Sequence, residues 1–239
     1  MGKINYSLDF TSMENIKILP CTNHLKGIHS LLFDQETPRD DFIFYFDLMA
    51  IQIVETALEF PLDYAPTEIK TSVTNNYTFQ GLQQINEMVA VNIIRSGDCF
   101  MNSVRKTLPE IIIGKLLIQS DIETGEPRLH MEALLPTITL PNTKVFLFDA
   151  QIISGAACIM AIQVLIDYGV DTLNIIVCAY LSTEIGLRRI LRAFPDIKIV
   201  VGKLSTMYGE VKEYNKEGCK DTDWIFSNRF IDSLYFGTN

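Results

Sequence analysis

The segment 145–169 constrains the fold more than any other part of the sequence. Four apolar residues, 145–148, lead to Asp149, which is the pattern of a buried strand in an α/β protein. A short loop follows, and Ser154 is predicted to cap a helix whose apolar residues recur at helical spacing up to Gly169. The sequence therefore predicts a strand, an acid, a loop of small residues and a helix in succession.

The joint between this strand and this helix has the properties of a phosphate site. Backbone N–H groups at a helix start favour an anion, and Gly155, Ala156 and Ala157 leave room for it to approach. Asp149 at the strand end can face a ribose or a metal. Joints of this kind also occur in α/β proteins without any ligand, so a purely structural joint is the alternative. The sequence has no Gly-x-x-x-x-Gly-Lys-Ser/Thr motif, so a P-loop kinase is not predicted.

Other segments extend this pattern to a single α/β domain over residues 1–239. Strands are predicted at 88–94, 111–118, 175–180 and 197–201, and helices at 41–60, 99–108 and 182–194, the last with Ser182 as its cap. The order predicts a mostly parallel sheet flanked by helices, with right-handed crossovers. Ligands of such sheets bind beyond the carboxyl ends of the strands, which is where residues 95–97, 149–157 and 181–183 are expected.

The remaining segments are predicted as additions to this domain. Residues 1–22 are expected to form an arm, 69–82 a β-hairpin and 205–223 a polar surface insertion. The wide apolar surface of the helix 41–60 suits either burial or a subunit interface.

Composition and charge limit the partners and the location. A net charge of −9 argues against nucleic-acid binding, which needs clustered Lys and Arg, but permits a small phosphorylated sugar or nucleotide. No apolar run is long enough to span a membrane, and no signal peptide is seen. Five cysteines without a paired spacing suit a reducing compartment, so a cytoplasmic location is expected, with the nucleus as an alternative.

Four motifs in a fixed order carry a resemblance to a known family. They are Arg95-Ser96-Gly97, the run Ile-Gly-Lys-Leu-Leu-Ile-Gln at 113–119, the segment 149–157 and the terminal Tyr-Phe-Gly-Thr at 235–238. In this order the sequence resembles uracil phosphoribosyltransferases over residues 23–239. It is most similar in pattern to the phosphoribosyltransferase-like domain of uridine kinase-like proteins, which read Thr-Gly-Ala-Ala where this chain has Ser-Gly-Ala-Ala at 154–157.

The resemblance implies a type I phosphoribosyltransferase fold and the conversion of uracil and phosphoribosyl pyrophosphate into UMP and pyrophosphate. It implies that Asp149 is the catalytic residue facing the ribose hydroxyls. The residues implied to bind phosphoribosyl pyrophosphate are Arg95, Ser96 and Gly97 near the pyrophosphate, and Ser154, Gly155, Ala156 and Ala157 around the 5′-phosphate. Mg²⁺ is expected to travel with the pyrophosphate, and GTP as an effector is left open.

Departures from the family pattern concern mainly the base. Members of the family read close to Pro-Gly-Leu-Gly-Asp-Ala-Gly-Asp-Arg where residues 226–234 stand here. The glycines that let backbone amides approach the base are absent, so the residues that bind a base are not assigned. The degenerate loop contains the polar or bulky residues Phe226, Ser227, Asn228 and Asp232. The phosphate loop also departs, because Ala150, Gln151, Ile152 and Ile153 replace Pro-Met-Leu-Ala.

Three hypotheses follow, and whether the protein is an enzyme stays open among them. The first is an enzyme of pyrimidine salvage with weak or no remaining activity. The second is a pseudoenzyme that binds a nucleotide or phosphate and regulates a uridine kinase as its partner. The third is a structural protein that only forms oligomers. A homo-oligomer is expected in each case, and the intact small-residue loop favours the first two hypotheses.

Overall fold

A central sheet organises the protein, as the sequence predicts. The computed structural model describes residues 10, 13–60, 62–72, 77–121, 126–205 and 228–238. Within these residues seven strands form one sheet in the order β1-β9-β8-β7-β4-β5-β6. The strands are β1 (Ile16–Ile18), β4 (Met88–Ile94), β5 (Ile112–Ser120), β6 (Pro127–Ala133), β7 (Lys144–Ile152), β8 (Ile175–Thr183) and β9 (Lys198–Ser205). All neighbouring strands are parallel except β6, which runs antiparallel to β5.

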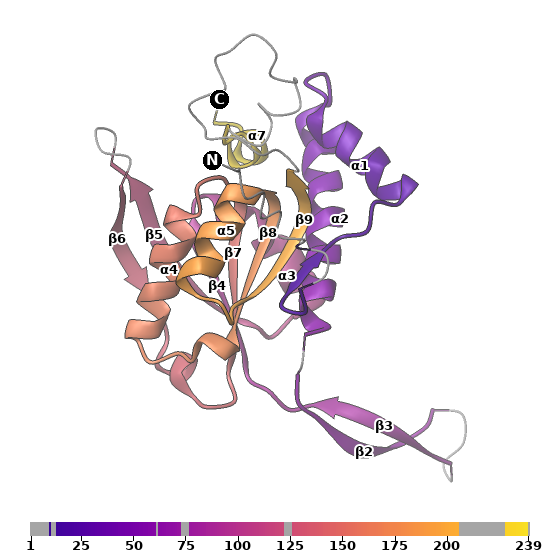
Figure 1. Ribbon diagram of the computed structural model, residues 1–239. Helices are drawn as coiled ribbons and strands as arrows, with labels where there is room; N and C mark the ends of the chain where they lie inside the picture. Colours follow the sequence, from indigo (N-terminus) through magenta and orange to yellow (C-terminus); the bar gives the residue numbers. More distant parts are fainter. Residues whose placement is uncertain are drawn as a thin grey trace, which may run out of the picture.

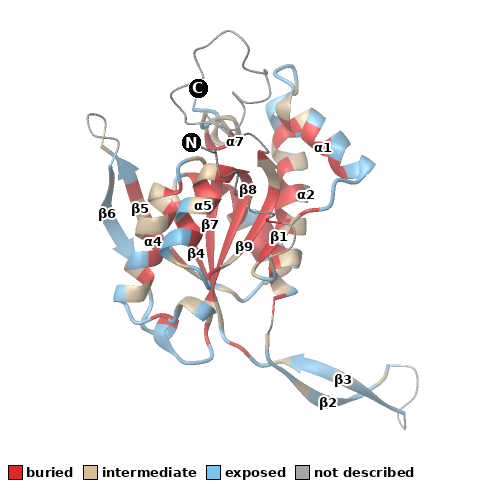
Figure 2. Ribbon diagram, in the orientation of Figure 1, coloured by how far each residue is buried: buried red, intermediate tan, exposed pale blue. Residues whose placement is uncertain are grey.

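Helices cover both faces of the sheet (Figure 1). On one face lie α1 (Asn23–Phe33), α2 (Arg39–Leu58), α3 (Met101–Thr107) and α7 (Ile231–Phe236), and on the other lie α4 (Ala156–Asp167) and α5 (Glu184–Ala193). Short 3-10 helices stand at η2 (Ser96–Phe100), η3 (Pro136–Thr139) and η4 (Thr172–Asn174). Because both faces are covered, every residue of β8 is buried, and Figure 2 shows the central strands as the buried interior.

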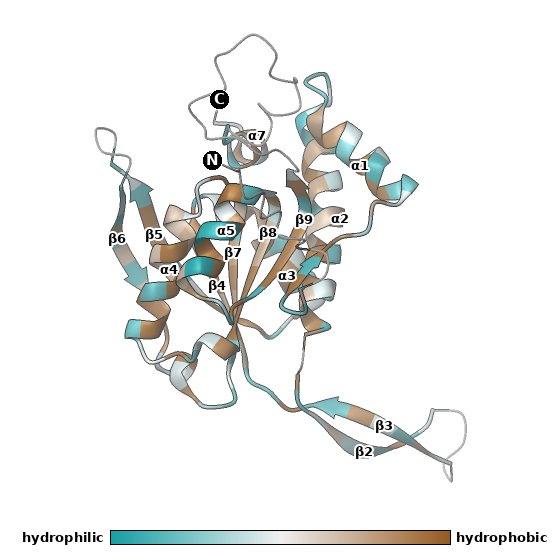
Figure 3. Ribbon diagram, viewed as in Figure 1, coloured by the Kyte–Doolittle hydropathy of each residue, from teal (hydrophilic) through white to brown (hydrophobic). Residues whose placement is uncertain are grey.

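The expected hairpin is a separate two-stranded sheet. Strand β2 (Tyr64–Lys70) pairs antiparallel with β3 (Thr78–Gln84), and the hairpin projects from the body of the molecule in Figure 1. Strand β2 begins before the predicted 69. Both hydrophilic (teal) and hydrophobic (brown) residues occur along the hairpin in Figure 3. Large apolar side chains such as Phe79 and Leu82 are exposed on the hairpin.

The end of the predicted arm and the predicted helix 41–60 both pack against other parts of the same chain. The end of the predicted arm forms β1, which pairs with β9 at the edge of the sheet. The apolar surface of α2 is buried against α1, α3 and the sheet of the same chain, with Phe46 and Ile53 fully covered. The predicted insertion at 205–223 lies outside the described residues beyond Ser205. None of the described helices has the length and apolarity needed to cross a membrane.

Three predicted boundaries around the carboxyl edge are wrong. Strand β7 does not stop at Asp149 but continues to Ile152, because β8 pairs with it as far as Ser182. Ser154 is not the cap of α4, which is capped by Gly155 in a left-handed conformation with φ of 75°. Ser182 lies within β8, and the side chain of Thr183 caps α5 by accepting from the N–H of Gly186 at 2.9 Å. Pairing between strands therefore overrides the local signals for their ends.

Candidate functional site

Two of the residues predicted to form a site, Ser96 and Asp149, meet at the carboxyl edge of β4 and β7. Ser96 Oγ donates to Asp149 Oδ1 at 2.6 Å, and the N–H of Ala150 donates to Ser96 Oγ at 2.9 Å. Gly97 packs so tightly that a Cβ at this position would overlap the carbonyl oxygen of Phe148. The predicted convergence is confirmed where Ser96 meets Asp149, and where the hydroxyls of Ser182 and Thr183 donate to the carbonyl oxygens of Ile152 and Ile153.

Asp149 itself is buried, with 1% of its surface exposed. Its Oδ1 accepts from Ser96 and from the N–H of Gln151 at 3.4 Å, and lies 3.9 Å from Nη1 of Arg229. These partners compensate a carboxylate that is removed from water. The carboxylate is thus held within the chain, and its predicted role toward a ribose stays a prediction.

The loop predicted to hold a phosphate is more accessible than Asp149. Ser154 is exposed, Ala156 and Ala157 are half-buried, and Gly155 is buried at the start of α4. The N–H of Ala156 lies 3.4 Å from Ser154 Oγ. A Cβ at Gly155 would lie 2.8 Å from the carbonyl oxygen of Gly186, so the close approach of the two helix starts requires glycine. The first turn of α4 can therefore present backbone N–H groups and a hydroxyl to an anion.

Arg95 is a basic group at this edge, and it has an internal partner. Its Nε and Nη2 both lie 2.8 Å from Oδ2 of Asp232 at the start of α7, while 48% of its side chain is exposed. The Ile94–Arg95 peptide bond is cis. Of the predicted base loop, Asn228 and Asp232 are described, whereas Phe226 and Ser227 lie outside the described residues.

Sequence reasoning missed the role of Gln151, which it recorded only as a departure. Gln151 is 1% exposed, and its side chain binds the backbone of residues 228–232, which we name the closing segment. Gln151 Nε2 donates to the carbonyl oxygen of Asn228 at 2.9 Å, and Oε1 accepts from the N–H groups of Phe230 and Ile231 at 2.8 and 3.1 Å. The available signal was a polar residue amid apolar ones in a segment that the sequence marks as buried.

Beneath the site, the remaining polar groups form a small cluster. Asp98 accepts from Nδ2 of Asn92 and from Lys115 Nζ at 3.2 Å, while Asn92 Oδ1 is buried without a hydrogen-bond partner in the described part of the chain. Burial raises the pKa of the Cys99 thiol well above its usual range, and the nearby Asp232 and Asp98 add to this effect. A thiol in this state is a poor nucleophile.

No resident metal site stands out near these residues. The described residues contain no group of three or more His, Cys, Asp or Glu side chains that could hold a metal ion. The carboxylates of Asp149 and Asp98 are engaged by neighbouring donors. The Mg²⁺ ion that the resemblance implies together with a pyrophosphate stays a prediction.

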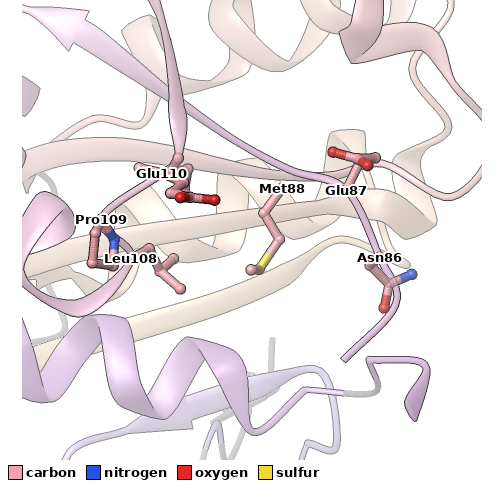
Figure 4. A pocket seen from close by; sticks show the side chains of 7 residues that line it. Asn86, Glu87, Met88, Leu108, Pro109 and Glu110 are labelled. Carbon is pink, nitrogen blue, oxygen red and sulfur yellow. The ribbon is translucent and has the colours of Figure 1, made fainter. Parts of the chain in front are cut away.

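Two open hollows lie elsewhere on the described surface, and the second of them reaches the start of α4. One, of about 510 Å³, lies at the amino ends of β4 and β5, and Figure 4 shows the side chains that line it, among them Met88, Leu108, Glu87 and Glu110. The second, of about 500 Å³, runs between α4 and β6 from Ala156 to Asp167. Only the second touches a predicted site residue, Ala156.

Comparisons with known proteins agree with the geometry. The model of the uracil phosphoribosyltransferase family matches residues 19–222. A uridine kinase of Saccharomyces cerevisiae is 46% identical over 231 residues, which are 97% of this chain but 44% of that protein. A uracil phosphoribosyltransferase of Lachancea kluyveri is 35% identical over 191 residues, covering 80% of this chain and 86% of that protein. The AQ2163 protein from Aquifex aeolicus shares the fold, with a TM-score of 0.68 and 22% identity over 80% of this chain and 87% of its own.

Proposed function

The chain belongs to the uracil phosphoribosyltransferase family, and from this premise we propose that it binds a phosphoribosyl ligand of pyrimidine salvage at the carboxyl edge of the sheet. The type I phosphoribosyltransferase fold expected from the resemblance is confirmed. The proposed ligand is phosphoribosyl pyrophosphate with Mg²⁺, or a nucleotide with the same ribose phosphate. Transfer to uracil is proposed to be weak or absent.

One observation carries this proposal. At the start of α4 Ser154 is exposed, whereas the neighbouring Asp149 and Gln151 are buried and the side chain of Gln151 is bonded to the closing segment. The first feature supports phosphate binding through backbone N–H groups. The second argues against efficient transfer, because a catalytic group has to reach the reacting atoms.

A second candidate function is that of a non-catalytic regulator acting beside a uridine kinase. It is favoured by the similarity to the uridine kinase of Saccharomyces cerevisiae, in which the matching region is 44% of the protein. Because the matching region belongs to a protein named as a uridine kinase, we propose a uridine kinase as the partner of this chain. In this version the ligand would signal the nucleotide supply, and the chain would act as a homo-oligomer in the cytoplasm. A GTP effector remains open.

Calorimetric titration tests the proposed function. Phosphoribosyl pyrophosphate with Mg²⁺ is expected to bind the wild-type protein, and Asp149→Asn is expected to weaken this binding about tenfold because a neutral amide accepts hydrogen bonds from ribose hydroxyls more weakly than a carboxylate does. Asp167→Asn, at the far end of α4 where Asp167 accepts from Gln163 Nε2 at 2.8 Å, is the matched control. Unchanged affinity in Asp149→Asn would mean that the ligand binds elsewhere. A parallel assay for UMP formation from uracil separates the enzyme from the regulator.

A further inference from the structure

Gln151 is a buried carboxamide at the centre of the candidate site. It lies two residues after Asp149 on β7, so both side chains point to the same face of the strand. Gln151 is 1% exposed, and both polar atoms of its side chain have partners. A buried amide whose polar atoms all form hydrogen bonds holds the groups bonded to it in one position.

The partners of Gln151 are backbone groups of the closing segment. One carbonyl oxygen, of Asn228, and two N–H groups, of Phe230 and Ile231, converge on one planar amide at 2.9, 2.8 and 3.1 Å. The two N–H donors require an acceptor, and the carbonyl requires a donor. This arrangement is complementary to any group in which a C=O and an N–H lie side by side.

Pyrimidine bases such as uracil carry such a group, because their ring edge is a lactam with adjacent C=O and N–H. We propose that Gln151 is a specificity-determining residue whose carboxamide occupies the backbone groups that would otherwise receive the lactam edge of a pyrimidine. This proposal rests on the proposed function, since it takes the ligand of this edge to be a phosphoribosyl compound. According to this inference, the wild-type chain binds phosphoribosyl ligands that lack a base in preference to ligands that carry a pyrimidine.

Two ion pairs hold the same segment against the site. Arg95 binds Asp232 at 2.8 Å, and Arg229 lies 3.9 Å from Asp149. Ile231 is fully buried in the core formed with α2. A base would therefore have to displace the carboxamide of Gln151 from a segment that is anchored elsewhere, whereas a phosphate at the start of α4 would displace none of these groups.

The test compares two ligands that differ only in the base. UMP carries the lactam edge, and ribose 5-phosphate lacks it. Gln151→Met removes the internal amide and keeps an unbranched side chain of similar length. Gln163→Met, on the exposed surface of α4, is the matched control.

Affinities are measured by calorimetry for each protein with each ligand. Hydrogen exchange at the amides of Phe230 and Ile231 is measured in parallel without ligand. Gln151→Leu, which also removes both polar atoms of the carboxamide, serves as the second variant if Gln151→Met does not fold.

The expected result is specific to the base. In Gln151→Met, UMP should bind at least about tenfold more tightly than in the wild type, because the backbone groups of Asn228, Phe230 and Ile231 no longer have an internal hydrogen-bond partner. Ribose 5-phosphate should bind both proteins equally, and the amides of Phe230 and Ile231 should exchange faster. The control should match the wild type in all three measurements.

Other results overturn the inference in distinguishable ways. Ribose 5-phosphate binding without a gain for UMP would overturn the role of Gln151 and leave the proposed function standing. An equal gain for both ligands would mean that Gln151 gates the whole site and not the base. Absence of binding by either ligand to all the proteins would overturn the proposed function and this inference together, and unchanged amide exchange would overturn the role of Gln151 independently of any ligand.

Discussion

Gly155 sets the backbone conformation at the start of α4. Its φ of 75° lies in the left-handed region that other residues adopt at a cost, and the carbonyl of Gly186 approaches it closely. Two independent constraints therefore meet at one position, one conformational and one steric.

Replacement of Gly155 by alanine should lower the free energy of unfolding by at least about 2 kcal/mol, because the left-handed conformation and the contact with Gly186 are both strained. Gly27→Ala is the control, since Gly27 lies within α1 and a Cβ there meets nothing within 4 Å. That substitution should stabilise the protein by about 0.5–1 kcal/mol. Chemical denaturation measures both values, and equal effects of the two changes would contradict the described start of α4.

His29 is a second residue with a testable property. Its Nδ1 forms a 2.9 Å hydrogen bond with the hydroxyl of the buried Tyr180, and its ring stacks on that of Phe33. Burial, with a smaller contribution from the charge of Lys203, lowers the pKa of His29 from 6.5 to about 4. The unfolded chain therefore takes up a proton at a pH where the folded chain does not.

This difference predicts a pH dependence of stability. The free energy of unfolding should be highest above pH 6.5 and should fall as the pH drops from 6.5 toward about 4, because the unfolded state binds the extra proton in this range. His29→Phe should make the dependence flatter over the same range. His24→Phe, on the exposed part of α1, should keep the wild-type slope. Urea denaturation at several pH values is the measurement, and identical slopes for wild type and His29→Phe would contradict the burial of His29.

Among the elements, α7 links the closing segment to the body of the protein. Arg39 of α2 donates to the carbonyl oxygens of Leu234 and Tyr235 at 3.3 and 2.9 Å, near the end of α7. At its start, α7 carries Asp232, the partner of Arg95. The helix therefore places the carboxylate of Asp232 against Arg95, the residue that the resemblance implies near a pyrophosphate.

Asp232→Asn should free Arg95 for an external anion. Pyrophosphate with Mg²⁺ is expected to bind the variant about threefold to tenfold more tightly, because the ligand no longer competes with an internal carboxylate. Asp121→Asn removes another ion pair, with Arg128 beside the β5–β6 hairpin, and should leave the affinity unchanged. Isothermal titration measures these affinities, and weaker binding to Asp232→Asn would show that the acid helps to form the site.

The sequence predicted the elements better than their ends. Residues 88–94 were predicted as a buried strand and form β4 with the same bounds, because a run that is apolar except for Asn92 leaves little choice when both faces are covered. The end of β7 was missed because Asp149 and Gln151 are polar, and only the closing segment, distant in sequence, supplies partners for Gln151. Contacts of this kind depend on the folded chain and cannot be inferred from local spacing.

At the scale of the whole molecule, the sheet separates two apolar layers. Cys99 and Cys178 lie in the layer that contains α2, and Cys158 lies in the layer that contains α4. Burial raises the pKa of all three thiols, whereas Cys21 is exposed. Reactivity of the thiols therefore reports on the integrity of both layers.

A thiol reagent should modify Cys21 in the native protein and should reach Cys99, Cys158 and Cys178 only after unfolding, because their thiolates are disfavoured and covered. Peptide mapping by mass spectrometry identifies each modified cysteine. Denaturant should release the three buried thiols together if the two layers unfold as one unit. Modification of Cys158 as fast as that of Cys21 in native buffer would contradict the packing of α4 on the sheet.

The central claim is that a phosphoribosyl ligand binds at the carboxyl edge of β4 and β7. Hydrogen exchange with and without phosphoribosyl pyrophosphate and Mg²⁺ tests it most directly, because it locates the ligand along the backbone. The account predicts slower exchange at residues 154–158 and 95–97. Protection confined to the hollow at 86–88 and 108–111, or no protection at all, would contradict it.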